Sequence, residues 1–276
     1  MIHFMVAATL ALSGVAAPLS GVAAPQHPGV RVLQLNLCNS GMAPCWDDKP
    51  GSDATRAPQT IQKASQVFAS LNPRPSVVVM NEVCSDDLKG LKQRLNLKGD
   101  TFFPALNGSD PHKCGGKRPG GGGEYGTAIL TAEELPEPWD DYKKYVVYRD
   151  QDPGEAEKRI MGCRNMKSFT VCGSHLGVVA NEAQCTQLLH TANTWASRGP
   201  LIISGDMNLR WNNADEQQKL KNCMRNVPGF TRKSDGKRQH VFTRNGGWGF
   251  PSTNPTGTVS MGTWSDHDAF WADLRP

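Results

Sequence analysis

The chain has 276 residues, with 30 Lys and Arg against 26 Asp and Glu, and a formal net charge of +4 at pH 7. This length supplies one large domain with a real core, and the mild basic excess permits a phosphate-rich substrate without requiring one. We find no internal repeat and no second long apolar segment, which excludes a repeat protein and a protein with several membrane spans.

The first 24 residues contain no Lys, Arg, Asp or Glu. The apolar stretch Phe4 to Val15 is too short and too rich in Ala and Gly for a comfortable membrane span. Residues 21–24 (Gly-Val-Ala-Ala) supply the small side chains that signal cleavage prefers, although a basic segment before the apolar stretch is missing. We therefore predict a secretion signal at residues 1–24 and a single extracellular domain at residues 25–276.

Eight cysteines in an exported chain predict disulfide bonds. No Cys-x-x-Cys pair occurs, so their spacing does not indicate zinc sites. The spacing suggests three local pairs and leaves the full pairing open: Cys38 with Cys45, Cys163 with Cys172, and Cys185 with Cys223.

Apolar periodicity predicts the elements in chain order. In the first half we expect a strand at 31–37, a loop to about Pro58, a helix at 60–71, a buried strand at 76–80 and a helix at 86–95. Residues 102–123 are expected to be irregular, and their Gly-rich part at 115–123 is predicted to be a mobile basic loop. Lys117 and Arg118 in that loop are expected to be solvated, with substrate contact as the alternative.

In the second half we expect strands at 125–130, 145–148, 159–163, 168–173 and 239–243, a helix at 183–195, a possible charged helix up to Asn226, and a closing strand after Ser265-Asp266-His267. Helices and strands alternate, but hairpins interrupt a strict β-α-β order. The pattern predicts an α+β fold, a sandwich of mixed sheets.

The stretch from Leu201 to Asn208 is the centre of this pattern. Its apolar run predicts a strand buried on both faces, and Asp206 and Asn208 follow at alternate positions, so that their side chains project together. Hard oxygen donors at the end of a buried strand suit Mg²⁺ or a phosphate. A simple turn after a strand is the alternative.

Other predicted strands also end in polar residues, namely Asn36, Glu82, His175 and the pair Asp266-His267. Each of these residues alone is weak evidence, because a single His or Glu at a strand end is more often structural. If all these ends lie at one edge, the site contains metal ligands, phosphate donors and proton-transfer groups.

The motifs resemble, in their order, those of the endonuclease/exonuclease/phosphatase superfamily, which includes deoxyribonuclease I. The resemblance covers roughly Val30 to Leu274 and rests on these motifs: Leu-Asn36, Asn-Glu82, Tyr125-Gly-Thr-Ala-Ile-Leu130, Ser-His175-Leu, Gly-Asp206-Met-Asn208 and Ser-Asp266-His267. It implies a four-layer α/β/β/α sandwich of two packed mixed sheets, with the active site at one edge, and a Mg²⁺ ion for which Mn²⁺ or Ca²⁺ can substitute.

The resemblance also implies roles. Glu82 would be the principal metal carboxylate, with Asn36 and Asp266 completing the environment of the metal. Asp206 would orient or deprotonate the attacking water, and Asn208 would hydrogen-bond the scissile phosphate. His175 and His267 would stabilise developing charge and assist proton transfer. Arg210, Gln239 and Tyr125 are expected to bind substrate.

One position departs from the family pattern. Where many members carry an Asp that orients the final histidine, this chain has Gln239 or His240, and Asp235 is the alternative carboxylate. A neutral amide can hold an imidazole tautomer but stabilises the charged ring less well. We therefore expect weakened or altered activity.

The leading hypothesis is a secreted, monomeric, Mg²⁺-dependent phosphodiesterase that acts on DNA. Six basic residues of the later loops would contact phosphates, although an ordinary solvated surface explains them almost equally well: Arg210, Arg232, Lys233, Lys237, Arg238 and Arg244. One alternative is a phosphatase or phosphodiesterase that acts on inositol phosphates, phosphoinositides or sphingomyelin, with Trp248-Gly-Phe250 touching a membrane or packing in the core. A second alternative is a catalytically weakened binding protein on the same scaffold.

Overall fold

The computed structural model describes residues 29–134, 143–196, 199–244, 246–253 and 255–276. The predicted secretion signal at residues 1–24 lies outside the described residues. No helix in these ranges combines the length and the apolar character that crossing a bilayer requires.

Two large mixed sheets form the centre of the molecule. The first has the order β14 (Thr256–Val259), β15 (Ala269–Leu274), β1 (Val30–Asn36), β2 (Val77–Cys84), β6 (Tyr125–Thr131) and β3 (Gly99–Pro104). The second has the order β12 (Phe230–Ser234), β13 (Gln239–Arg244), β11 (Leu201–Asp206), β10 (Thr170–His175), β9 (Ile160–Asn165) and β7 (Lys143–Val147). Short strands β4 (Leu106–Asn107), β5 (Asp110–Pro111) and β8 (Glu157–Lys158) make a third, small sheet.

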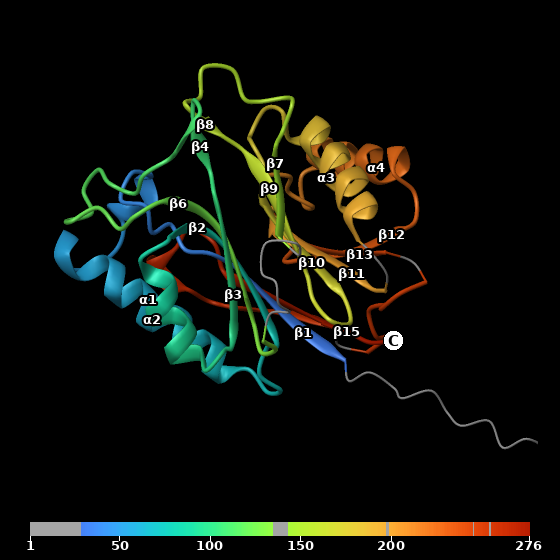
Figure 1. The fold of residues 1–276 in the computed structure, drawn as a ribbon, viewed down its shortest axis with the longest axis horizontal. Coiled ribbons are helices and arrows are strands. Elements are labelled where there is room, and N and C mark those ends of the chain that lie inside the picture. Colours follow the sequence, from blue (N-terminus) through green and yellow to red (C-terminus); the bar gives the residue numbers. More distant parts are fainter. Residues whose placement is uncertain (1–28, 135–142, 197–198, 245, 254) are drawn as a thin grey trace, which may run out of the picture.

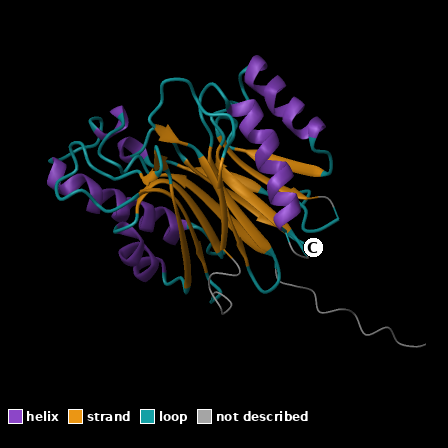
Figure 2. Ribbon diagram, turned by 45° about the horizontal axis from the view of Figure 1, so that its top comes forward, coloured by secondary structure: helices purple, strands orange, loops and turns teal. Residues whose placement is uncertain are grey.

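Four helices cover the outer faces of the two sheets (Figures 1 and 2). Helices α1 (Asp53–Ser70) and α2 (Asp87–Leu95) pack on the first sheet, and α3 (Asn181–Trp195) and α4 (Ala214–Asn226) pack on the second. Strands β1 and β2 are parallel, as are β10 and β11, while the other pairs in both sheets are antiparallel. The predicted α/β/β/α sandwich of mixed sheets is confirmed.

The central strands are buried on both faces, which explains their continuous apolar runs. In β1, Val30 and Val32 pack in the core between the two sheets, whereas Leu33 and Leu35 pack in the core beneath α1 and α2. The same alternation in β11 sends Ile202 between the sheets and Ile203 towards α3. The two sheets therefore share one interior layer, and each has its own helix-covered layer.

The cysteines form four disulfides in the described residues, Cys38–Cys45, Cys84–Cys114, Cys163–Cys172 and Cys185–Cys223. The three pairs suggested by spacing are thus confirmed. Cys163 and Cys172 are direct cross-strand neighbours in β9 and β10, and Cys185–Cys223 joins α3 to α4. These bonds tie neighbouring layers and strands rather than the two halves of the sandwich.

Some boundaries were predicted wrongly. Helix α1 begins at Asp53 and includes Pro58, where a loop was expected; an acidic residue in the first turn favours the helix and was the missed signal. The expected irregular segment contains the end of β3 and the short strands β4 and β5. Strands β12 and β14 were not predicted.

The Gly-rich loop is anchored, contrary to expectation. Arg118 is almost fully buried and pairs with Asp87 at 2.8 Å, while Nη1 also donates to the carbonyl of Asn39. Lys117 lies at the surface and pairs with Asp47. Trp248 is buried against Phe169, so its place is in the core.

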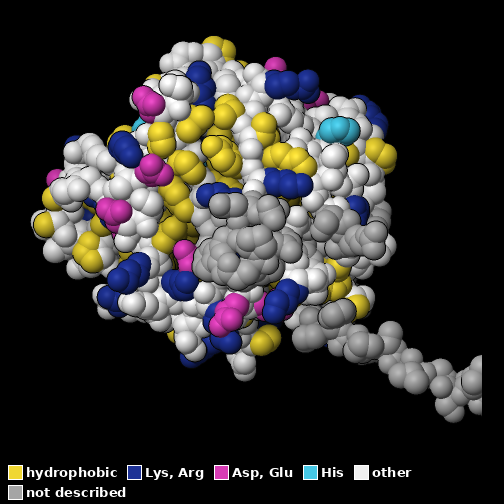
Figure 3. Space-filling model, in the orientation of Figure 1, with side chains coloured by type: hydrophobic (Ala, Val, Ile, Leu, Met, Phe, Trp, Pro, Cys, Tyr) yellow, Lys and Arg dark blue, Asp and Glu magenta, His cyan; other side chains and the backbone are white. Residues whose placement is uncertain are grey.

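On the face seen in Figure 3, hydrophobic side chains gather in a band from the upper middle of the molecule towards its left, with charged side chains scattered around them. The edge strands β3 and β7 face the viewer here, and the ammonium of Lys143 lies 5.4 Å from the ring centre of Phe103. Such snorkelling lysines cover apolar surface with their aliphatic stems. The catalytic candidates come instead from the ends of the inner strands.

Candidate active site

The polar strand ends meet across the two sheets. Asn36 ends β1, Asp206 ends β11 and His175 ends β10. The side-chain Nδ2 of Asn36 donates to Glu82 Oε1 at 2.8 Å and to Asp206 Oδ2 at 3.2 Å. One amide thus joins a carboxylate of the first sheet to a carboxylate of the second. Its Oδ1 accepts from the backbone N–H of Cys38, which fixes the orientation of the amide.

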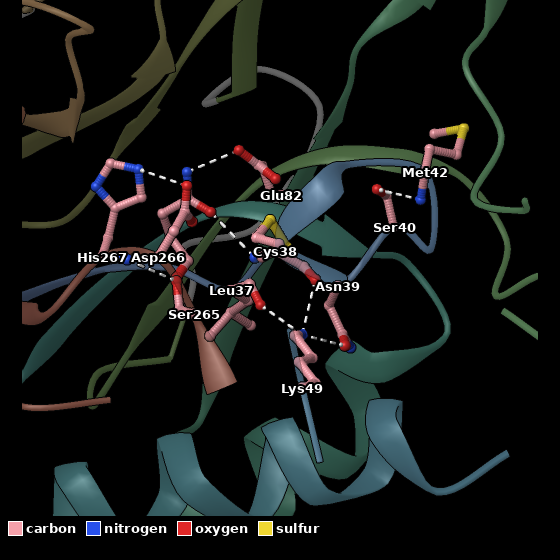
Figure 4. The surroundings of a disulfide bond; sticks show 12 residues. Leu37, Cys38, Asn39, Ser40, Met42, Lys49, Glu82, Ser265, Asp266 and His267 are labelled. Atoms are coloured by element: carbon pink, nitrogen blue, oxygen red, sulfur yellow. Dashed lines mark hydrogen bonds and ion pairs between the residues drawn. A yellow bond between two sulfur atoms is a disulfide. The ribbon is translucent and has the colours of Figure 1, made fainter. Parts of the chain in front are cut away.

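His267 completes this group on the side of β15. Its Nε2 lies 3.2 Å from Asp206 Oδ2 and 3.6 Å from Asp266 Oδ2. Figure 4 shows His267 and Asp266 beside Glu82 and the Cys38–Cys45 disulfide. The side chain of Asp266 is half exposed, whereas that of Asp206 is buried. Asp266 is therefore the carboxylate of this group that solvent reaches most easily.

His175 is held on the opposite side of the group. Its Nδ1 lies 2.7 Å from Arg159 Nη1, and its Nε2 lies 3.2 Å from Asn208 Nδ2 and 3.9 Å from Glu82 Oε1. Asn208 is fixed by its Nδ2 donating to the carbonyl of Leu176 and by its backbone N–H donating to Asp206 Oδ1. His175, Asn208 and Asp206 therefore lie next to one another, with Asn208 bonded directly to Asp206.

Left-handed backbone is concentrated at this group. Glu82 has φ 53°, Asn208 has φ 47° and Cys38, two residues after the end of β1, has φ 47°. Non-glycine residues adopt this region at a cost of about 1–3 kcal/mol each, and such residues cluster at functional sites. A β-bulge between Met80 and Val83 accompanies the turn at Glu82 and redirects its side chain. The local backbone is thus shaped to present these side chains.

Burial changes the charge states of the site. Desolvation raises the pKa of Glu82 to about 7, although the hydrogen bond from Asn36 opposes the shift. Desolvation, followed by the charge of Arg159, lowers the pKa of His175 well below its ordinary value. Lys49, whose Nζ donates to the carbonyls of Leu37 and Cys38, has a pKa lowered by burial to about 7. Because its pKa is lowered, the ring of His175 is uncharged at neutral pH.

A buried polar network behind the site was missed by the sequence analysis. Asn81 Oδ1 accepts from Gln34 Nε2 at 2.8 Å and from the backbone N–H of Asp206 at 2.9 Å, while its Nδ2 donates to Thr127 Oγ1 and to the carbonyl of Ser174. The network locks β1 and β2 to β10 and β11 directly beneath Asp206. The available signal was Gln34, a polar residue on the same inward face as Val30 and Val32.

The residues expected to bind substrate have different surroundings. Arg210 is exposed, and its Nη2 pairs with Glu216 at 2.6 Å. Tyr125 is buried next to Arg159 and His175. Gln239 is fully buried beside Asp206 in the sheet, and its Nε2 donates to the carbonyl of Asp268 at 3.3 Å, with no partner for its Oε1 among the described atoms. Gln239 therefore has no exposed surface for a substrate in this structure.

The three candidates for the partner of His267 also have definite places. Asp235 accepts hydrogen bonds from the backbone N–H groups of Lys237 and Gln239, and burial raises its pKa. His240 lies between Arg232 and the carbonyl of Leu209. The carboxylate nearest to His267 Nε2 is none of these candidates but Asp206, at 3.2 Å, followed by Asp266 at 3.6 Å.

A cavity of about 300 Å³ opens beside His267 and is lined by Arg210, Asn212, Lys237, Arg238, Asp266 and His267. Of the six basic residues noted in the sequence, three reach this cavity. Arg232 instead stacks over Trp211 with its guanidinium carbon 3.8 Å from the ring centre, and Arg244 donates to Asn193 and to the carbonyl of Gly199. The basic cluster is therefore divided between a cavity wall and structural contacts.

The sequence matches no known protein-family profile, and it matches no curated protein. Solved structures do resemble it. An endonuclease/exonuclease/phosphatase family protein from Bacteroides thetaiotaomicron has a TM-score of 0.57 at 15% identity, covering 90% of this chain and 97% of that chain. Danio rerio TDP2 complexed with a single-strand DNA product has a TM-score of 0.55 at 13% identity, covering 91% and 100%. A mannosyl-6-phosphatase from Bacteroides thetaiotaomicron has a TM-score of 0.56 at 15% identity, covering 89% and 99%.

These likenesses extend over nearly the whole of each chain compared. Identities of this order establish a shared fold, and fold alone does not fix a substrate. The fold expected from the motifs is thus confirmed, and the chemistry must be argued from the side chains.

Proposed function

We propose that this chain, which has the fold of the endonuclease/exonuclease/phosphatase structures, hydrolyses phosphodiester bonds with the help of a divalent metal ion, and that its substrate is DNA. The observation that carries the proposal is the joining of Glu82 and Asp206 by one Asn36 amide, with His267 on one side and His175 on the other. Carboxylates, amide donors and imidazoles in one group are the parts that phosphoester hydrolysis needs.

The donor set fits a hard divalent cation. Glu82 and Asp266 offer carboxylate oxygens, which Mg²⁺ prefers and which Mn²⁺ and Ca²⁺ also accept. The high pKa of Glu82 marks a buried carboxylate that lacks sufficient positive charge nearby, and a cation would restore its ionised form. Asn36 would hold Glu82 in place through its amide, since its own oxygen already accepts from Cys38. A bound metal would supply Lewis acidity to the phosphate.

The chain's own residues would divide the remaining work. Asp206, buried and fixed by Asn36 and by the N–H of Asn208, is placed to orient the attacking water and accept its proton. His267, in contact with Asp206, is placed to stabilise charge on the phosphate and to move a proton. Asn208 and His175 are placed to donate to phosphate oxygens.

The cavity beside His267 supports a phosphodiester chain as substrate. Lys237, Arg238 and Arg210 give it a positive wall next to the reacting group, where a second phosphate of a nucleic acid would lie. Glu216 already neutralises part of the charge of Arg210, so Lys237 and Arg238 are the stronger candidates. The comparison with a TDP2 that holds a DNA product is consistent with this choice.

The protein is proposed to act outside the cell as a monomer. Four disulfides in the described residues are typical of an oxidising compartment, and they accord with the secretion signal predicted at residues 1–24.

A substrate panel tests the function. Residues 25–276, with disulfides formed, are assayed with and without Mg²⁺ on supercoiled plasmid, single-strand DNA, an inositol phosphate, a sugar phosphate and sphingomyelin vesicles. We expect Mg²⁺-dependent DNA hydrolysis that Glu82→Gln abolishes. Turnover of only a sugar, inositol or lipid phosphate would replace DNA as the substrate. If none of the esters is hydrolysed, whether or not calorimetry detects Mg²⁺ binding, the remaining function is that of a binding protein.

A further inference from the structure

Contacts of both its side chain and its backbone fix the position of Arg159. It lies between β8 and β9, and its side chain is mostly buried. Nη1 pairs with Glu157 Oε1 at 2.9 Å, the backbone N–H donates to Gln151 Oε1, and the backbone carbonyl accepts from Gln151 Nε2. These contacts hold the guanidinium against one ring nitrogen of His175, 2.7 Å away.

The chemistry of the two groups fixes the direction of this hydrogen bond. A guanidinium has N–H donors and no acceptor, so Nδ1 of His175 must accept. A ring nitrogen that accepts carries no proton, and the single proton of the neutral ring is then on Nε2. Adding a proton to Nδ1 would bring two positive N–H groups face to face at 2.7 Å.

A second histidine in the same sheet shows the full pattern. Nδ1 of His240 lies 2.9 Å from Arg232 Nη1, and its Nε2 lies 2.8 Å from the carbonyl oxygen of Leu209. There the arginine donates to Nδ1, and the proton on Nε2 is used by a backbone acceptor. His240 is thus an internal reference for an imidazole whose tautomer an arginine sets.

His175 differs from this reference at Nε2. That atom faces Asn208 Nδ2 at 3.2 Å, and Asn208 Nδ2 is oriented by its donation to the carbonyl of Leu176 at 2.8 Å. The neutral ring has a single acceptor nitrogen, and the charged guanidinium at 2.7 Å takes it in preference to the neutral amide at 3.2 Å. The Nε2–H group and Asn208 Nδ2 are then two donors, which cannot hydrogen-bond each other. Glu82 Oε1 at 3.9 Å is beyond hydrogen-bond distance. The Nε2–H group and the second N–H of Asn208 Nδ2 therefore lack an acceptor among the residues that the structure describes, and one oxygen atom of a ligand would satisfy both.

We propose that Arg159 is a positioning residue that fixes His175 as the neutral ring protonated at Nε2, so that His175 and Asn208 form a two-donor cradle for a non-bridging phosphate oxygen. In this arrangement His175 keeps its proton throughout the reaction, and proton transfer is left to His267 and Asp206. The role in catalysis rests on the proposed phosphoesterase function, whereas the tautomer stands on the contacts of the free protein.

The tautomer is tested first, by long-range ¹H–¹⁵N correlation spectra of the ¹⁵N-labelled protein without substrate. Signals are assigned with His175→Gln and His240→Gln. We expect His175 and His240 to show the same pattern, a bare Nδ1 and a protonated Nε2. In Arg159→Met the His175 pattern should move towards a mixture of tautomers while that of His240 stays. Arg232→Met should do the reverse. A proton on Nδ1 of His175 in the wild type, or an unchanged His175 pattern in Arg159→Met, would overturn the proposal.

Kinetics then test the link to catalysis. Because the cradle would act on charge that develops in the transition state, Arg159→Met should lower kcat on the order of 10–100-fold with little change in KM. Arg159→Lys, which keeps one donor, should recover part of the loss, and Arg149→Met, an exposed arginine, should have no effect. Glu157→Gln gives a milder variant if Arg159→Met folds poorly. Correct tautomers without hydrolysis of any phosphoester would refute the proposed function alone, and a fall in kcat without a tautomer change would refute this inference alone.

Discussion

The Nε2 atom of His267 lies 3.2 Å from Oδ2 of Asp206, and the same oxygen accepts a hydrogen bond from Asn36 at 3.2 Å. Asp206 belongs to the second sheet, whereas Asn36 and the strand that follows His267 belong to the first. The candidate proton-transfer pair is therefore assembled only when the two sheets pack together.

Removing the charge of Asp206 should impair hydrolysis without unfolding the protein. Asp206→Asn keeps the shape of the side chain but cannot accept a proton from water, so we expect kcat to fall on the order of 10²–10³-fold. His267→Gln should have a loss of similar size, and the double variant should be little worse than either single one, because the two residues act as a unit. Asp215→Asn on the exposed start of α4 is the control. Full additivity of the two losses would contradict a shared role.

Glu82 should make the stability of the metal-free protein depend on pH. Its folded pKa of about 7 lies above the ordinary 4.5, so the folded state keeps a proton that the unfolded chain has lost. The free energy of unfolding should therefore fall as the pH rises from about 4.5 to about 7, by a contribution of about 3 kcal/mol. Above pH 7 this contribution should be constant.

Urea unfolding in EDTA at pH 5 and pH 8 measures this effect as the difference between the wild type and Glu82→Gln, which cannot ionise. Glu134→Gln at an exposed position serves as the control for a lost surface carboxylate. Mg²⁺ affinity in calorimetry should rise over the same pH range, because the ion binds the deprotonated form. A pH-independent difference between wild type and Glu82→Gln would refute the assignment.

The amide of Asn81 should be important for both stability and activity. Asn81→Ala would leave Gln34 Nε2, the N–H of Asp206 and the carbonyl of Ser174 without this partner, and we expect a loss of about 2–4 kcal/mol in the free energy of unfolding. Asn226→Ala at the exposed end of α4 should change it by less than about 0.5 kcal/mol. Below the melting temperature kcat should also fall, because Asp206 loses its support. A stable, fully active Asn81→Ala would contradict this role.

The positive cavity should control the salt dependence of DNA binding. Replacing Lys237 and Arg238 together by Ala should weaken binding to the catalytically inactive Glu82→Gln protein and reduce the slope of log K against log salt by about 1–2. The pair Lys221→Ala and Arg225→Ala on α4 removes the same charge from an outer helix. Equal effects of the two pairs would show general attraction rather than contact at the cavity.

Much of the fold followed from local pattern. The apolar runs at 76–80 and 201–203 lie in strands buried on both faces. Parallel pairing brings β1 beside β2 and β10 beside β11 with their carboxyl ends at the same edge of each sheet, and the packing of the two sheets then brings the polar residues together. The helix start at Asp53 and the short strands after residue 102 were not predicted, because Pro58 and the Gly-rich segment are strong turn signals. In the folded chain, tertiary packing outweighs these local signals.

The sequence predicts which residues belong to the candidate site, but it does not predict their contacts. Spacing placed Asn36, Glu82 and Asp206 at strand ends, although β2 continues for two residues past Glu82. Only the folded chain shows that one amide holds both carboxylates. Arg159 gave no signal, because nothing in a single sequence tells a buried arginine beside a histidine from a solvated one. Gln239 was placed on the right strand, and its full burial could not be foreseen.

The division of the acidic side chains between two sheets also provides an assay that needs no knowledge of the substrate. A cation held by Glu82 of one sheet, close to Asp206 of the other, would link the two sheets in the folded state. Anything that binds the folded state alone raises the melting temperature by mass action. Scanning calorimetry with a series of divalent ions should therefore rank the ions by how far each raises the melting temperature. A nucleotide or a sugar phosphate added afterwards should raise the melting temperature again if the site binds it.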